Sequence, residues 1–109
     1  MDPELLRQLQ EGCRTGNPIV LFEGGVIRRA QRDLRIKDEL DARKAIGYKS
    51  SSEFKEERVA SRAYRNNPGH TLENYLLDYR GTVVYLSFFK TPAGAMIIKS
   101  FHRADHGSL

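Results

Sequence analysis

The stretch TLENYLLDYRGTVVYLSFFKTPAGAMIIKSFH, residues 71–102, decides the fold class, because its apolar pattern has a period of two. It divides into three runs rich in strand-forming residues, 71–79, 82–90 and 95–102. Arg80-Gly81 separates the first two runs, and residues 91–94 separate the second two. Both separators have the composition of hairpin turns, so the stretch predicts a three-stranded antiparallel meander.

Alternation along a strand assigns the side chains of this meander to two faces. If both separators are complete loops, Tyr85 lies opposite Leu76 and Ser100, and His102 lies opposite Val83. We expect the apolar face to pack on helices; it carries Tyr75, Leu77, Tyr79, Val84, Leu86, Phe88, Ile97 and Phe101. We expect the half-polar face to look out of the core; it carries Asn74, Leu76, Asp78, Val83, Tyr85, Ser87, Ile98, Ser100 and His102. A slip of one residue in either loop would reverse these assignments.

The residues before the meander have mainly helical patterns. Asp2-Pro3-Glu4 predicts a helix start, and Gly12 or Gly16 ends that helix. Residues 19–22 predict a short strand, and residues 23–27 a turn into a second short strand or a helix. Two further helices are predicted over residues 32–48 and 50–67. The expected fold is therefore α+β in one domain, residues 1–109, with the helices of the first 65 residues packed on one face of the C-terminal antiparallel sheet.

Composition narrows the class of protein. The chain has 109 residues and a formal net charge of +4, which mildly favours an anionic partner such as nucleic acid. The only cysteine, Cys13, excludes a disulfide within the chain and is expected to be a small core residue. No apolar run approaches the roughly 18 residues of a membrane span, and the N-terminus lacks a signal-peptide pattern. We expect a cytoplasmic protein that does not bind membranes.

Several enzyme motifs are absent from the sequence. Gly24-Gly25 forms neither a dinucleotide fingerprint nor a P-loop, and no serine lies in GxSxG. His102 and His106 have the spacing of a metal pair on a helix, but at a strand end this spacing does not bring two side chains together. We therefore expect no metal and no cofactor. The remaining chemistry is metal-independent RNA cleavage, in which a base activates the 2′-OH and cations stabilise the phosphorane.

Short motifs in the second half of the chain support that chemistry. They are His70-Thr71, Tyr79-Arg80, Val84-Tyr85-Leu86 and Ser100-Phe101-His102. In these motifs the last 45 residues resemble the motility quorum-sensing regulator toxins, members of the RelE-like group of small bacterial RNases. The resemblance implies a RelE-like RNase toxin fold, mRNA cleavage, and a partner antitoxin protein.

The resemblance also implies roles for individual residues. The functional tyrosine of the family falls on Tyr85, its last-strand lysine on His102, and an upstream lysine on Arg62. The expected catalytic set is Arg62, His70, Tyr85 and His102. Nearby cations expected to bind RNA are Lys90, Lys99 and Arg103.

Each of these residues also has a structural interpretation. His102 could be an ordinary surface residue, Tyr85 a cover for the second face of the sheet, and His70 a loop residue or strand cap. Arg62 could belong to a solvated helix face. Residues 28–44 hold seven Lys or Arg against four Asp or Glu. This basic run could be an ordinary helix surface, or it could bind phosphate groups along a nucleic acid. A second class of function therefore stays open: a non-catalytic basic protein that binds nucleic acid or a host protein, such as a phage-encoded inhibitor.

Overall fold

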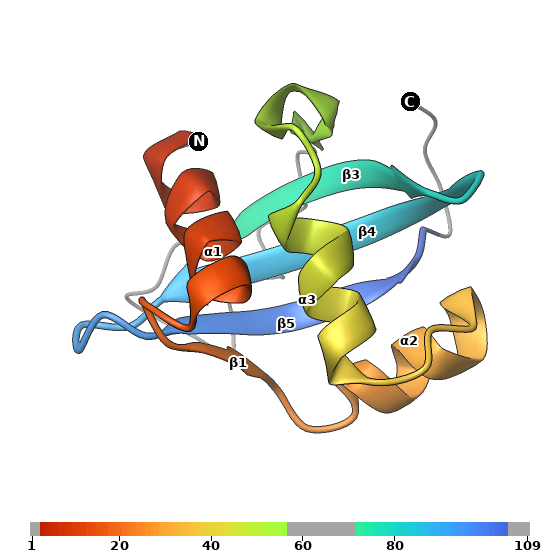
Figure 1. Ribbon diagram of the computed structural model, residues 1–109, viewed down its shortest axis with the longest axis horizontal. Coiled ribbons are helices and arrows are strands. Elements are labelled where there is room, and N and C mark those ends of the chain that lie inside the picture. Colours follow the sequence, from red (N-terminus) through yellow and green to blue (C-terminus); the bar gives the residue numbers. More distant parts are fainter. Residues whose placement is uncertain (1–2, 57–71, 105–109) are drawn as a thin grey trace.

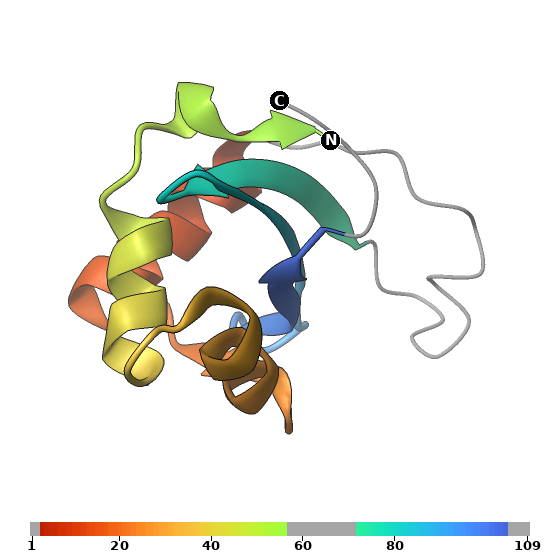
Figure 2. The ribbon, with the colours of Figure 1, turned by 90° about the vertical axis from the view of Figure 1, so that its right-hand side faces the viewer.

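The computed structural model describes residues 3–56 and 72–104, which form a five-stranded sheet with helices on one face (Figure 1). The helices are α1 (Pro3–Thr15), α2 (Val26–Leu34) and α3 (Glu39–Gly47), followed by the 3-10 turn η1 (Ser51–Glu53). The strands are β1 (Val20–Phe22), β2 (Lys55–Glu56), β3 (Glu73–Tyr79), β4 (Thr82–Lys90) and β5 (Met96–Arg103). Seen along the sheet, α1, α2 and α3 all lie on its concave side (Figure 2). The predicted α+β class is confirmed.

The sheet is larger than the predicted meander, and it is mixed. Its order is β1-β5-β4-β3-β2, in which β3, β4 and β5 form the expected antiparallel meander. The expectation of a purely antiparallel sheet is wrong, because β1 pairs in parallel with β5 through Val20↔Met96 and Phe22↔Ile98. Local sequence cannot specify this pairing, because it joins segments from opposite ends of the chain.

The β3–β4 register is as predicted. Tyr79 pairs with Thr82, and Leu76 lies opposite Tyr85. The two loop residues, Arg80 and Gly81, have φ angles of 52° and 87°, and two successive positive φ angles match the right-handed twist of the strands they join.

The β4–β5 register differs from the prediction in two places. The loop is one residue longer than expected, since Lys90 pairs with Met96 and the Thr91 N–H donates to the Ala95 carbonyl. A β-bulge then leaves Lys99 without a partner residue on β4, as Ser87 faces Ser100 and Phe88 faces Ile98. The pairs Tyr85–Ser100 and Val83–His102 were therefore wrong.

The corrected register changes both faces of the sheet. Tyr85 lies directly opposite His102, and Ile98 rather than Ile97 packs in the core, where its side chain is fully buried. The second face is not open along β3 and β4, because Asn74, Leu76 and Ser87 are at most 3% exposed. The prediction that these three residues look out into solvent was wrong.

The predicted helix 32–48 is two helices. α2 already begins at Val26, which resolves the alternatives at residues 23–27 in favour of a turn followed by a helix. It ends at Arg35, whose left-handed φ of 56° stops the helix without glycine or proline. Asp38 then caps α3 by accepting a hydrogen bond from the Asp41 N–H at 3.1 Å.

The predicted helix 50–67 is wrong in its described part. Ser50 and Glu53 form a capping box, but it starts only the single turn η1. Lys55 and Glu56 then pair with Leu76 and Tyr75 as the edge strand β2. The rest of this predicted helix lies outside the described residues.

The core lies between the helices and the concave face of the sheet. Its fully buried members include Leu9, Ala30, Ala42, Ile46, Leu77, Val84, Leu86, Phe88, Met96 and Ile98. Cys13 belongs to this cluster, as expected, and burial raises the pKa of its thiol to about 12. Gly12 lets α1 approach the chain that enters β1, since a Cβ atom there would clash with the Pro18 carbonyl oxygen and the Val20 side chain.

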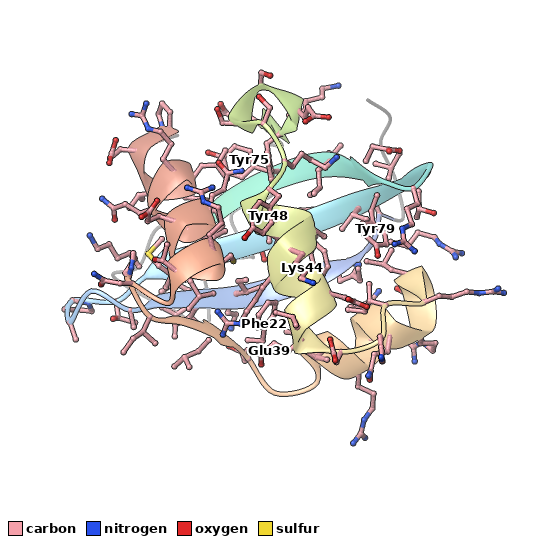
Figure 3. All side chains as sticks on the ribbon, in the orientation of Figure 1. Phe22, Glu39, Lys44, Tyr48, Tyr75 and Tyr79 are labelled. Carbon is pink, nitrogen blue, oxygen red and sulfur yellow. The ribbon has the colours of Figure 1, made fainter. Side chains whose placement is uncertain are left out.

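Arg43 of α3 covers the outer edge of β1. Its guanidinium donates to the Val20 carbonyl at 2.6 Å and lies 5.5 Å from the centre of the Phe22 ring. Glu39, one turn earlier, accepts from Arg43 at 2.8 Å; Figure 3 shows Glu39 and Phe22 together at this edge. A charged group on an edge-strand carbonyl blocks pairing with another chain.

Candidate functional site

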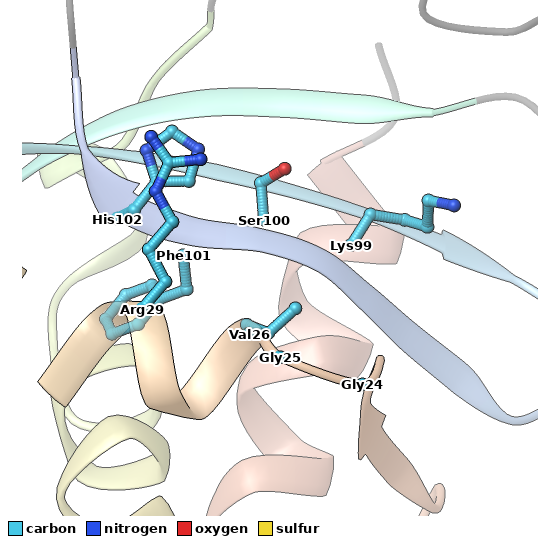
Figure 4. A pocket seen from close by; sticks show the side chains of 8 residues that line it. All are labelled: Gly24, Gly25, Val26, Arg29, Lys99, Ser100, Phe101 and His102. Atoms are coloured by element: carbon cyan, nitrogen blue, oxygen red, sulfur yellow. The ribbon is translucent and has the colours of Figure 1, made fainter. Parts of the chain in front are cut away.

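A cavity of about 230 Å³ lies where β1 ends and the chain turns away from β5 (Figure 4). The pairing of β1 with β5 reaches Ile98, whose carbonyl accepts from the Glu23 N–H at 2.9 Å. The chain then turns through Gly24-Gly25 into α2, so the beginning of α2 faces the end of β5 across the cavity. The walls are residues 24–26 and Arg29 on one side and residues 99–102 on the other.

The start of α2 contributes a favourable environment for negative charge. Gly25 is its N-cap, with a φ of 85° that a glycine adopts without strain. No side chain caps this helix end, and the Val26 N–H is turned back to the Glu23 carbonyl at 3.0 Å. The first N–H groups of a helix carry partial positive charge, which favours an anion beside them.

Two cationic side chains line the same cavity, and each has an acidic partner. Arg29 extends from α2 past Phe101 toward the His102 side of β5, with Nε 3.6 Å from an Asp33 oxygen. Lys99, the bulge residue, places its Nζ 2.9 Å from a Glu23 oxygen. The cavity therefore holds positive charge that is already partly neutralised.

Asp33 contacts both Arg29 and the end of β5. Its carboxylate accepts from the Arg103 N–H at 3.4 Å, and its carbonyl accepts from the Arg103 guanidinium at 3.2 Å. Burial alone would raise the pKa of this carboxyl, but a hydrogen bond from Arg32, the Arg103 N–H and the charges of Arg32 and Arg29 together lower it below the usual 3.8. Asp33 is thus an ionised anchor between α2 and β5.

His102 is the histidine among the residues that line the cavity. Its Nδ1 lies 2.8 Å from the Arg103 carbonyl oxygen, and because a carbonyl can only accept, Nδ1 carries the proton. In the neutral ring Nε2 then holds the lone pair, so it can act as a base. The ring centre of Tyr85 lies 5.7 Å away, which packs the imidazole against an aromatic side chain.

Tyr85 has a structural partner of its own. Its hydroxyl donates to Asn74 Oδ1 at 2.7 Å, and Asn74 in turn donates to the Leu72 carbonyl at 3.3 Å. Asn74 is only 2% exposed, so its side-chain oxygen needs a donor. The phenol is therefore engaged in holding β3 to β4, while its ring supports His102.

The predicted RNA-binding residues separate into two places. Lys99 lines the cavity, and Arg103 lies next to it with its side chain turned to α2. Lys90 donates a hydrogen bond to Gln8 of α1 at 2.9 Å. It lies five residues along β4 from Tyr85, a distance of about 17 Å at roughly 3.4 Å per residue. The structure does not bring Lys90 to this site. Arg62 and His70 lie outside the described residues.

Sequence reasoning missed Arg29 and the turn at Gly24-Gly25. The turn matches no phosphate-binding motif, and in the sequence Arg29 is one of seven cations in the basic run 28–44. The available signal was a pair of glycines directly before a helix that carries a cation one turn in. Among residues 3–56 and 72–104, no three His, Cys, Asp or Glu side chains are grouped to hold a metal ion.

No described helix is long and apolar enough to cross a membrane. Comparison with known proteins found no family model that matches the chain, no similar curated protein and no similar solved structure.

Proposed function

We propose that the protein is an endoribonuclease that cleaves RNA by attack of the 2′-OH on the adjacent phosphodiester, without a metal ion. The observation that carries the proposal is His102, whose Nδ1 bonds the Arg103 carbonyl and which lines one cavity together with Arg29, Lys99 and the start of α2. A base and cations around one small cavity are parts that such a reaction needs.

Each group has a defined role in the proposed reaction. His102 Nε2 removes the proton of the 2′-OH, and the 2′-oxygen attacks phosphorus. The bond from phosphorus to the 5′-oxygen breaks, which leaves a 2′,3′-cyclic phosphate, and water supplies the proton for the departing 5′-oxygen. Arg29 and Lys99 stabilise the additional negative charge of the phosphorane. Arg62, carried over from the family resemblance, and His70, which lies in one of its motifs, complete the proposed catalytic set.

The biological setting of the proposal is a toxin–antitoxin pair. The toxin would act on mRNA in the cytoplasm, with a RelE-like fold, and a protein antitoxin would neutralise it. The support is the resemblance in four short motifs between His70 and His102, and the α+β architecture is compatible with it.

The test is cleavage of a mixed-sequence RNA by the purified protein with EDTA present. His102→Ala should lower the cleavage rate by about 10²–10⁴-fold, the usual contribution of one general acid–base group. Its melting temperature should stay close to that of the wild type, because His102 is only half-buried at a strand end. The matched control is His106→Ala, which changes a histidine without a role in the mechanism. Full activity of His102→Ala would refute the assignment.

A second candidate is binding of nucleic acid without cleavage. It is favoured by the engagement of the Tyr85 hydroxyl with Asn74, which leaves His102 as the one proton-transfer side chain of the cavity within the described residues. Salt-sensitive RNA binding by a wild-type protein that cleaves no RNA would identify this function instead.

A further inference from the structure

The β-bulge on β5 aims a cation at the cavity. Lys99 is the extra residue between Ile98 and Ser100, so it has no partner residue on β4. Bulges often occur next to functional sites because they redirect one side chain. Here the redirected side chain is a lysine that lines the cavity and is only 20% exposed.

Glu23 is held in place to meet this lysine. Its N–H donates to the Ile98 carbonyl at 2.9 Å, and its own carbonyl accepts from the Val26 N–H at 3.0 Å. The backbone on both sides of Glu23 is therefore fixed, to β5 and to the start of α2. Its carboxylate, about half exposed, reaches Lys99 Nζ at 2.9 Å.

We propose that Glu23 is an internal competitor of the anionic ligand, which must displace the carboxylate from Lys99 to use that cation. This inference rests on the proposed function, because it takes the ligand to be the phosphodiester backbone of RNA. A phosphate group that approaches Lys99 exchanges one anion for another, so it gains only the difference between the two contacts. Glu23 thus weakens binding of every phosphate and limits the protein to ligands that also engage Arg29 and His102.

The experiment measures binding and not cleavage. The probe is a short fluorescent 2′-O-methyl oligoribonucleotide, which has phosphodiesters but no free 2′-OH, and the readout is fluorescence anisotropy at low salt. Glu23→Gln should bind it about five- to tenfold more tightly than the wild type, since a partly exposed charged contact is strengthened. Lys99→Gln should weaken binding in the wild type, because it removes a cation of the cavity, and should remove the whole gain in the Glu23→Gln background.

The matched control is Glu11→Gln. Glu11 forms an ion pair with Arg14 at the same distance, 2.9 Å, and is 54% exposed against 47% for Glu23. The substitution changes the net charge equally but lies on α1, away from the cavity. An equal gain in Glu11→Gln and Glu23→Gln would overturn the proposal, because overall charge would then explain both.

Two other outcomes separate this inference from the proposed function. If Glu23→Gln binds like the wild type while Arg29→Gln weakens binding, the cavity takes phosphate but Glu23 does not compete, and only the present inference fails. If Arg29→Gln and Lys99→Gln leave binding unchanged in every background, the cavity is not the phosphate site and both fail.

Discussion

Replacing Tyr85 with phenylalanine tests whether its hydroxyl acts in structure or in chemistry. The substitution removes the donor that lies 2.7 Å from Asn74 Oδ1 and leaves that buried oxygen without this bond. Loss of a partner for a buried polar group costs about 1–2 kcal/mol of unfolding free energy. An unfolding entropy of roughly 2.1 cal/mol/K per residue converts this into a fall in Tm of about 4–9 °C for a chain of this length.

The assay is thermal unfolding beside RNA cleavage. The matched control is Tyr48→Phe, the same change at a residue that is 71% exposed and lies just after α3 (Figure 3). Tyr48→Phe should melt like the wild type, and Tyr85→Phe should melt lower while it keeps most of its cleavage rate below the melting range. A Tyr85→Phe protein with the wild-type Tm would refute the structural role, and one with wild-type Tm and no cleavage would make the phenol a catalytic group.

Two further predictions concern stability. Gly12→Ala should cost about 1–3 kcal/mol in urea unfolding because its new methyl group meets the Pro18 carbonyl and the Val20 side chain, whereas Gly24→Ala, which has open space around it, should be near neutral. The lowered pKa of Asp33 stabilises the folded state above the usual carboxyl pKa of 3.8, and this contribution is lost as the pH falls through the folded-state value. Asp33→Asn should accordingly be less stable than the wild type at pH 6, and the difference should shrink only as the pH falls below 3.8 toward the lower folded-state pKa; a difference that does not shrink below pH 3.8 would contradict the argument.

The parts of the fold that sequence predicted are those fixed by local chemistry. Arg80-Gly81 permits two positive φ angles between alternating runs, so the β3–β4 register followed from the loop alone. The bulge at Lys99 has no such signal, since no residue type there requires it, and it moved His102 opposite Tyr85. The end of α2 at Arg35 likewise has no signal in the sequence, because a helix usually stops at glycine or proline.

The sequence likewise predicted only those parts of the candidate site that local sequence patterns indicate. The sequence predicted a role for His102 from strand alternation and from the family resemblance, and the structure places this residue at the cavity. Arg29 and Gly25 were missed, because only the long-range pairing of β1 with β5 brings the start of α2 to that position. Lys90 was predicted to bind RNA because of its charge and its nearness in sequence. β4 has nine residues, however, so its two ends lie far apart.

The parallel pairing of β1 with β5 sets the order in which the protein can fold during synthesis. A nascent chain that has reached only Lys90 has no partner for β1 and lacks the strand on which α2 packs. Contacts between segments so far apart in sequence slow folding, because the entropy of closing the long loop is lost before they form. The cavity, which needs residues 24–29 and residues 99–102 together, is therefore among the last features to appear. If the protein cuts RNA as proposed, a fragment released early from the ribosome lacks both His102 and the cavity. Only a chain that extends through β5 can then cleave the mRNA of the cell that makes it.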